Sequence, residues 1–184
     1  MATPTLVSVN VGRIRAVPYR GHQVRTGIYK AAVDGPVMVR SLNLDGDEQA
    51  DLSVHGGVDK AVYLYPAEHY EAWQRELNRE LDYGTFGENL TVTGLLEDVV
   101  RIGDELAIGR ALLQVTEPRV PCFKLGIKMS DQRFLRRFLE SGRSGFYCRV
   151  LREGAVEAGQ SIELAQAGVD APTIAEVVRQ IRGA

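Results

Sequence analysis

The sequence predicts a mainly β fold, a small β-barrel decorated by a few helices. Short runs rich in β-branched and aromatic residues recur along the chain and are separated by glycine-containing turns. Two of these turns, Gly103-Asp104 and Gly109-Arg110, are of the hairpin type, which indicates a closed or strongly curved sheet. Helical periodicity is confined to a few stretches between strands, so we expect the helices to lie at the periphery.

The first third of the chain is predicted to contribute three strands. Alternation of apolar with polar or small residues favours one long strand that bends near Gly12 and stops at Pro18. A turn signal at Asp34-Gly35-Pro36 separates two shorter ones. The three predicted strands cover residues 6–17, 26–30 and 37–39.

The rest of the chain mixes strands with helices. Tyr70, Trp73 and Leu77 recur at helical spacing after Pro66, which suits the first turn of a helix. A capping-box pattern starts the last helix at Thr173. Strands are predicted at 60–65, 90–92, 99–102, 105–108, 111–115, 144–151 and 160–165, and helices at 67–81, from 130 or 131 to 142, and from 173 onward.

Composition bounds the class of protein. The 184 residues suffice for one ordinary core, and 45% are hydrophobic and 25% charged. A net charge of -2 argues against nucleic acid as the main partner, because neutralising phosphates needs a strongly basic face. Two cysteines provide neither a disulfide framework nor a zinc-binding spacing. No secretory leader or membrane span is recognisable, so we expect a cytoplasmic protein.

The best candidate for chemistry is Cys122, which lies in the strand-like run 115–125. Arg119 and Lys124 flank it, and cations favour the thiolate form that attacks electrophiles and binds soft metals. On these residues alone, a small buried hydrophobic side chain is the commoner outcome for a cysteine. That simpler role is expected for Cys148, whose predicted strand face is apolar.

Two further motifs lie in glycine-containing segments. Residues 55–60, His-Gly-Gly-Val-Asp-Lys, end a long polar loop and place His55 and Lys60 beside backbone N–H groups suited to an anion. Glu88 and Asn89 stand just before a strand, where Asn89 offers both a donor and an acceptor to a planar ligand. Taken singly, each motif is a weak signal, and for residues 55–60 an ordinary tight turn is the commoner outcome.

Five segments in a fixed order resemble the MOSC domain, the C-terminal domain of molybdenum-cofactor sulfurases. The resemblance is greatest to the small stand-alone bacterial branch, the YiiM-like proteins linked to resistance to 6-hydroxylaminopurine. It covers about residues 6–165, and five ordered motifs are far more specific than any single one. The segments are Thr-Gly-Ile-Tyr-Lys at 26–30, Ala-Asp-Leu-Ser-Val-His-Gly-Gly-Val-Asp-Lys-Ala-Val-Tyr at 50–63, Phe-Gly-Glu-Asn-Leu-Thr-Val-Thr-Gly-Leu at 86–95, Ile-Gly-Asp at 102–104 and Glu-Pro-Arg-Val-Pro-Cys-Phe-Lys-Leu at 117–125.

The resemblance implies a closed, mostly antiparallel β-barrel, similar to the small barrel domain of pyruvate kinase, that binds the molybdenum cofactor. It divides the chain into a MOSC domain at 1–168 and a shortened C-terminal helical module at 169–184. Cys122 matches the family's cysteine, which is thought to contact molybdenum or carry sulfur. Pyridoxal phosphate is not expected, because the desulfurase domain of composite relatives does not fit in this length. The remaining pocket residues implied by the match are Thr26, Lys30, His55, Lys60, Asn89, Arg119 and Lys124.

Three functions are compatible with these residues. The resemblance implies an oxidoreductase that reduces N-hydroxylated bases or related N-oxygenated compounds, and the absence of a flavin or nicotinamide motif implies electrons from a separate flavoprotein. A second possibility is a carrier or sulfur-transfer module that binds the cofactor without its own turnover. A third makes Cys122 a metal-free nucleophile with His55 as its base.

Overall fold

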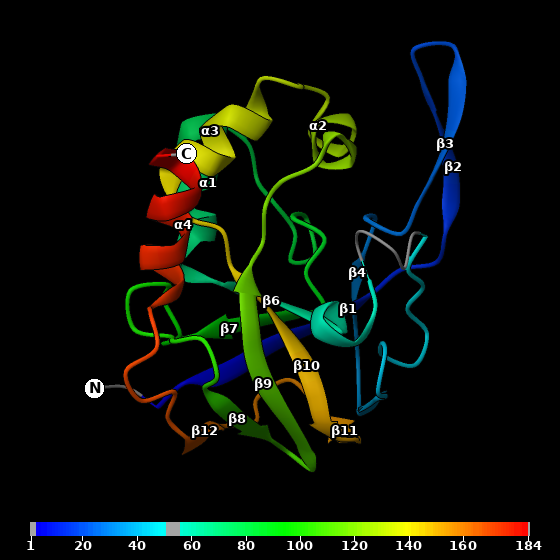
Figure 1. Ribbon diagram of the computed structural model, residues 1–184. Helices are drawn as coiled ribbons and strands as arrows, with labels where there is room; N and C mark the ends of the chain where they lie inside the picture. Colours follow the sequence, from blue (N-terminus) through cyan, green and yellow to red (C-terminus); the bar gives the residue numbers. More distant parts are fainter. Residues whose placement is uncertain (1–2, 51–55, 184) are drawn as a thin grey trace.

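The computed structural model describes residues 3–50 and 56–183, and an open eight-stranded sheet forms its centre (Figure 1). The strands of this sheet are β1 (Thr5–Val11), β4 (Ala31–Val33), β6 (Val62–Pro66), β7 (Leu90–Thr93), β8 (Glu105–Ile108), β9 (Ala111–Pro118), β10 (Phe146–Arg152) and β12 (Ile162–Gln166). Their order is β12-β8-β9-β10-β6-β7-β1-β4, and every neighbouring pair is antiparallel except β6 with β7. The predicted mainly β fold is therefore confirmed.

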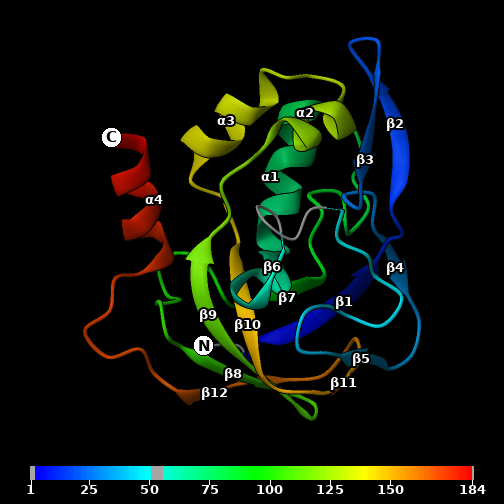
Figure 2. The same cartoon turned by 45° about the vertical axis from the view of Figure 1, so that its right-hand side comes forward.

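The helices gather toward one end of this sheet, where a small hairpin sheet rises beside one of them, and a second small sheet lies at the opposite end (Figure 2). One small sheet is a hairpin and the other joins distant segments. The paired strands are β2 (Arg15–Tyr19) with β3 (His22–Thr26) and β5 (Val37–Val39) with β11 (Gly154–Val156). The helices are α1 (Glu68–Leu77), α2 (Phe123–Met129), α3 (Phe134–Ser141), α4 (Ile174–Gly183) and the 3-10 turn η1 (Val58–Lys60). Among the described residues, no helix is both long and apolar enough to cross a membrane.

The predicted closed barrel is not confirmed, because no sheet among the described residues closes on itself. The eight-stranded sheet ends at β12 on one side and at β4 on the other. Its curvature brings the start of β1 near β12, where Thr5 and Ser161 form one isolated bridge. Hydrogen bonding does not continue beyond β4, which has only three residues, because the following strand β5 pairs with β11 instead.

Strand β6 separates two hydrophobic cores. All five of its residues are buried, and successive side chains point to opposite faces. Val62 and Leu64 join an aliphatic core that includes Cys148, whereas Tyr63 and Tyr65 join an aromatic core beneath the helices. The predicted core position of Cys148 is confirmed. The aromatic core is completed by Tyr70, Trp73, Phe86, Leu125, Met129, Phe134 and Phe138.

The N-terminal strands differ from those predicted. The strand expected over 6–17 is two strands, because the chain leaves the main sheet after Val11 and begins a separate hairpin at Arg15. Pro18 lies within β2 rather than ending it, which a two-stranded hairpin permits because each strand has a free edge. The strand expected over 26–30 ends at Thr26.

Two predictions near the helices also need correction. Residues 99–102 form no strand, because their backbone bonds to the start of α4, with Ile174 N donating to Val100 O at 2.9 Å. Helix α2 was not predicted, because the run 115–125 with its two prolines was interpreted as the end of a strand. Helix α4 is confirmed, and so is the end of α3 at Gly142, but α3 begins at Phe134 rather than at 130 or 131, because Ser130 ends α2 in a left-handed conformation. The division of the chain at residue 168 stays a prediction.

The capping box at the start of α4 gives a first test of the fold. Thr173 N donates to Glu176 Oε2 at 2.7 Å, and Glu176 N donates to Thr173 Oγ1 at 3.2 Å. We expect Thr173→Ala to lower the free energy of unfolding by about 1 kcal/mol, because one helix N–H loses its acceptor. Thr173→Ser keeps the hydroxyl and should lose much less in the same urea titration. Equal losses in the two variants would contradict the capping role.

Candidate functional site

A single pocket collects segments that are far apart in the sequence. Its wall is formed by the chain after β3, the loop before η1, the turn before β7 and the junction between β9 and α2 (Figure 1). Tyr63 of β6 and Tyr147 of β10 form part of the lining from the aromatic side of the sheet. The full lining is Thr26, Gly27, Ile28, Lys30, Glu48, Gln49, Ala50, Lys60, Tyr63, Gly87, Asn89, Arg119, Cys122, Lys124 and Tyr147.

The structure brings together all the predicted site residues that it describes. The cysteine is joined there by four cationic side chains, a buried hydroxyl and a buried amide. His55 lies outside the described residues, so its predicted part in the site stays a prediction. The predicted residues that line the pocket are Thr26, Lys30, Lys60, Asn89, Arg119, Cys122 and Lys124.

Cys122 marks the point where an extended segment becomes a helix. Its backbone is extended, with φ -118° and ψ 167°, and it directly precedes α2. The side chain is half-buried and forms no disulfide. Its place at a pocket wall, rather than in either core, excludes for Cys122 the simple buried role that Cys148 has.

Arg119 is a buried cation beside this cysteine. The residue is 6% exposed, and its guanidinium carbon lies 5.1 Å from the ring centroid of Tyr63 and 5.7 Å from that of Phe138. Burial alone would lower the pKa of Arg119, but the neighbouring phenol and thiol groups, Tyr63 first, raise it above its ordinary value. The guanidinium therefore stays charged and gives the pocket a permanent positive wall.

Lys30 and Asn89 are tied to one buried carboxylate. Lys30 Nζ forms an ion pair with Asp47 Oδ1, and Asn89 Nδ2 donates to Asp47 Oδ2 at 3.0 Å. Burial lowers the pKa of Lys30, and Asp47 acts against this effect. The Asn89 oxygen accepts from Tyr63 N at 3.1 Å. The amide predicted to contact a ligand thus already bonds to the protein at both ends, and its main effect is to hold the pocket wall.

The turn before β7 depends on two glycines and one buried acid. Gly84 and Gly87 have φ of +86° and +85°, and a Cβ on Gly84 would meet Lys30 O at 2.8 Å. Glu88 is completely buried and accepts from Gly84 N at 2.8 Å and from Phe86 N at 3.1 Å. The hydrogen bonds to Glu88 hold the turn in the conformation that places Asn89 in the pocket wall.

Lys128 joins the same turn to the segment after β3. Its Nζ donates to Ile28 O at 3.0 Å and to Gly84 O at 2.6 Å. Burial lowers the pKa of Lys128 to about 8, and nearby Glu88 acts in the opposite direction. The Lys128 ammonium therefore connects two pocket walls, and its pKa of about 8 lies closer to neutral pH than that of an ordinary lysine.

This arrangement predicts a pH dependence of stability. Between about pH 8 and the ordinary lysine pKa of 10.5, the unfolded chain holds a proton on Lys128 that the folded chain has released. The unfolding free energy should therefore rise through this interval, by about 3 kcal/mol in total, relative to that of Lys128→Met. Urea titrations of both proteins from pH 7 to pH 10.5 measure this difference. A difference that stays constant with pH would contradict the assignment.

Two buried polar atoms at the pocket lack partners within the described part of the chain. Arg119 Nη1 is an unused donor and Gln49 Oε1 an unused acceptor. Both residues line the pocket. Because buried polar groups are nearly always hydrogen-bonded, a donor and an acceptor left unpaired here favour a polar ligand at this place.

Several lining residues were missed by the sequence analysis. Tyr63 and Tyr147 lie on predicted strands, and alternation alone would have placed Tyr147 opposite Cys148, on the pocket side. Gln49 lies in a polar loop without regular periodicity, so no sequence signal marked it. Asp47 and Lys128 stand just outside the lining but hold it in place.

Comparisons with known proteins identify a family and several relatives of this chain. The MOSC domain model matches residues 51–163. The uncharacterized protein YflK of Bacillus subtilis is 44% identical over 164 residues, which cover 89% of this chain and 74% of YflK. A protein of Gibberella moniliformis named "Reductase" is 38% identical over 181 residues, covering 96% of this chain but 32% of that protein.

A solved structure is similar along almost the whole chain. The crystal structure of YiiM from Geobacillus stearothermophilus superposes with a TM-score of 0.81 and 36% identity, covering 97% of this chain and 83% of that one. The family model, the relatives and this structure agree with one another and with the ordered motifs. The chain therefore belongs to the MOSC domain family.

Proposed function

We propose that this protein binds the molybdenum cofactor and reduces N-hydroxylated bases or related N-oxygenated compounds, with electrons from a separate flavoprotein. The convergence of Cys122 with Lys30, Lys60, Arg119 and Lys124 in one pocket carries this proposal. A thiol that binds soft metals and cations that bind phosphate are the two groups such a cofactor requires. Membership of the MOSC family and the similarity to a protein named reductase support it.

The chemistry of the donor set fits this cofactor better than a bare metal ion. Among the described residues, no three His, Cys, Asp or Glu side chains cluster as metal ligands. Molybdenum within its pterin cofactor brings most of its own ligands, so the one thiol at this pocket, Cys122, fits its needs. Arg119 Nη1 and Gln49 Oε1, which have no partner among the described residues, offer a donor and an acceptor that a polar pterin can use.

The side chains then have separate tasks. Cys122 would bind the metal through its sulfur, while Arg119 and Lys124 would hold the phosphate. When bound, the cofactor supplies the two-electron redox chemistry. The overall reaction breaks the N–O bond: R–NH–OH takes up two electrons and two protons and yields R–NH2 and water. The tyrosine rings of Tyr63 and Tyr147 present an aromatic wall to a planar base.

Purification from a host that makes the cofactor tests the proposal. We expect molybdenum by elemental analysis, a pterin by fluorescence after oxidation, and reduction of 6-hydroxylaminopurine when reduced methyl viologen is supplied. Metal-free and pterin-free protein that still performs the reduction would sink the proposal. Bound cofactor without any turnover would instead identify a carrier or sulfur-transfer module.

A further inference from the structure

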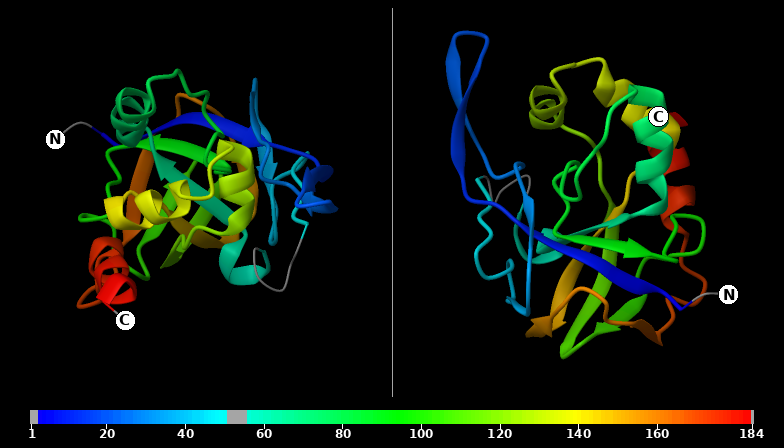
Figure 3. Two further views of the ribbon diagram at one scale, coloured as in Figure 1. Left: turned by 90° about the horizontal axis from the view of Figure 1, so that it is seen from above. Right: turned by 180° about the vertical axis from the view of Figure 1, so that it is seen from behind.

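The β2–β3 hairpin stands out from the body of the molecule beside α2 (Figures 1 and 3). Among the described residues, its two strands pair only with each other and form a separate sheet. Val17, Tyr19, Val24 and Thr26 alternate along one face and are at least half-buried, while the intervening residues of both strands are exposed. The hairpin therefore presents one face to the protein and the other to solvent.

This part of the chain is strongly basic. Residues 12–33 contain no Asp or Glu, although the whole chain carries a net charge of -2. We call residues 13–26 the basic arm, because they include Arg13, Arg15, Arg20 and Arg25. All four arginines are exposed, and none has a carboxylate within 4.0 Å among the described residues. Arg15 stacks on the ring of Tyr29 and Arg20 lies over that of Tyr19, but among the described residues no carboxylate neutralises the charge of the arm.

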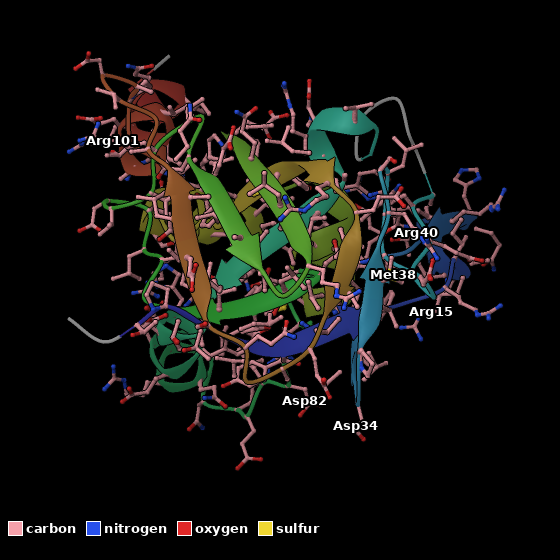
Figure 4. The ribbon with its side chains drawn as sticks, turned by 90° about the horizontal axis from the view of Figure 1, so that it is seen from below. Arg15, Asp34, Met38, Arg40, Asp82 and Arg101 are labelled. Atoms are coloured by element: carbon pink, nitrogen blue, oxygen red, sulfur yellow. The ribbon has the colours of Figure 1, made fainter. Side chains whose placement is uncertain are left out.

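The basic arm adjoins the mouth of the pocket. Thr26 ends β3 and lines the pocket, and the Tyr19 ring lies 5.7 Å from that of Phe123, the residue after Cys122. Phe123 is 41% exposed and Val120 is 51% exposed. Figure 4 places Arg15 at the opposite side of the molecule from Arg101, which lies near the start of α4. The positive charge of the basic arm therefore lies on the same side of the molecule as the pocket.

We infer that the exposed face of the basic arm, together with Val120 and Phe123, docks the acidic surface of the flavoprotein that delivers electrons. This inference rests on the proposed function, which requires such a donor. A five-residue strand spans roughly 16 Å, so charges spread along the hairpin match a macromolecule rather than a single phosphate group. Exposed apolar side chains among arginines are typical of protein interfaces.

Docking at this place puts the donor beside the pocket. A flavin hydroquinone would be oxidised to the quinone as it releases two electrons, and the N–O bond of the substrate is reduced with two protons to an amine and water. Complementary charge raises the association rate of such short-lived redox complexes, and salt weakens them. The net negative charge of the chain disfavours nucleic acid as the occupant.

Charge reversal tests the inference. One triple variant carries Arg13→Glu, Arg20→Glu and Arg25→Glu, and its matched control carries lysine at the same positions. With an acidic FMN-containing flavodoxin as donor at low salt, we expect the glutamate variant to lose about 10- to 100-fold in kcat/KM for the donor. The lysine control should remain close to the unmodified protein. Turnover driven by reduced methyl viologen should be the same in all three.

Three outcomes would overturn the inference. The first is equal flavodoxin-driven turnover in the glutamate and lysine variants. The second is failure of the unmodified protein to bind flavodoxin, and the third is salt-sensitive binding of a single-stranded oligonucleotide in its place. If the unmodified protein shows no turnover with reduced methyl viologen, that result refutes the proposed function instead. Flavodoxin binding, titrated at 20 and 300 mM NaCl, then still tests the docking surface on its own.

Discussion

Replacement of Cys122 by serine is expected to lower the rate of hydroxylamine reduction by more than about 100-fold while leaving the fold intact. A hydroxyl has nearly the volume of a thiol, but it is a hard, poorly ionised ligand that binds a soft metal weakly. The half-buried position of Cys122 at the pocket wall means that little packing is lost. Turnover with reduced methyl viologen, molybdenum content and the thermal midpoint measure the three effects.

Cys148→Ser is the matched control for this experiment. Cys148 is fully buried in the aliphatic core, and burial raises the pKa of its thiol. A hydroxyl without a partner at this position should cost about 1–3 kcal/mol of stability. Activity should persist at moderate temperature. If Cys122→Ser retains activity, Cys122 is not the metal ligand, and if Cys148→Ser alone abolishes it, the two cysteines have been assigned the wrong roles.

The contrast between these cysteines shows what local sequence can predict. Alternation along β10 was enough to place Cys148 in the core, because strand geometry sends every second side chain to the same face. No such periodicity governs Cys122, which follows two prolines at a strand–helix junction. Its place in the pocket was anticipated only from the order of several motifs, taken together with the family resemblance.

Predictions failed where distant contacts decide the local structure. Residues 99–102 have the composition of a strand, yet they bond to the start of α4. The curved sheet stays open because β5 pairs with β11, a segment more than a hundred residues away. Residues 27–30 leave the strand state where Gly27 passes the backbone of Glu48 so closely that a Cβ would lie 2.1 Å from its carbonyl oxygen. Such pairings are not encoded in any short window of sequence.

The candidate site was predicted more completely in its residues than in their roles. Lys30 and Asn89 line the pocket as expected, but both are held by Asp47, which carried no motif. The supporting role of Lys128 was not predicted either, because a lysine usually faces solvent and no motif marked this one. Lys30 and Asn89 belong to recognisable motifs, whereas the residues that hold them in place emerge only from the fold.

Glu88→Leu is expected to cause the largest loss of stability among single changes near the pocket. The carboxylate is completely buried and accepts hydrogen bonds from Gly84 N, Phe86 N, Thr91 Oγ1 and the Tyr70 hydroxyl. Leucine has a similar size but no acceptor. The hydroxyl groups are free to rotate, while the two backbone amides are not. We expect a loss of about 4 kcal/mol, because each unsatisfied buried amide costs about 1–3 kcal/mol.

The same substitution on the surface provides the control. Glu71 is 77% exposed and pairs with Arg75 one helical turn away, so Glu71→Leu should change the unfolding free energy by less than about 0.5 kcal/mol. Urea titration measures both variants. The turn that Glu88 holds also carries Asn89 into the pocket, so the folded fraction of Glu88→Leu should retain less molybdenum than Glu71→Leu does. Equal stability of the two variants would show that Glu88 does not organise this turn.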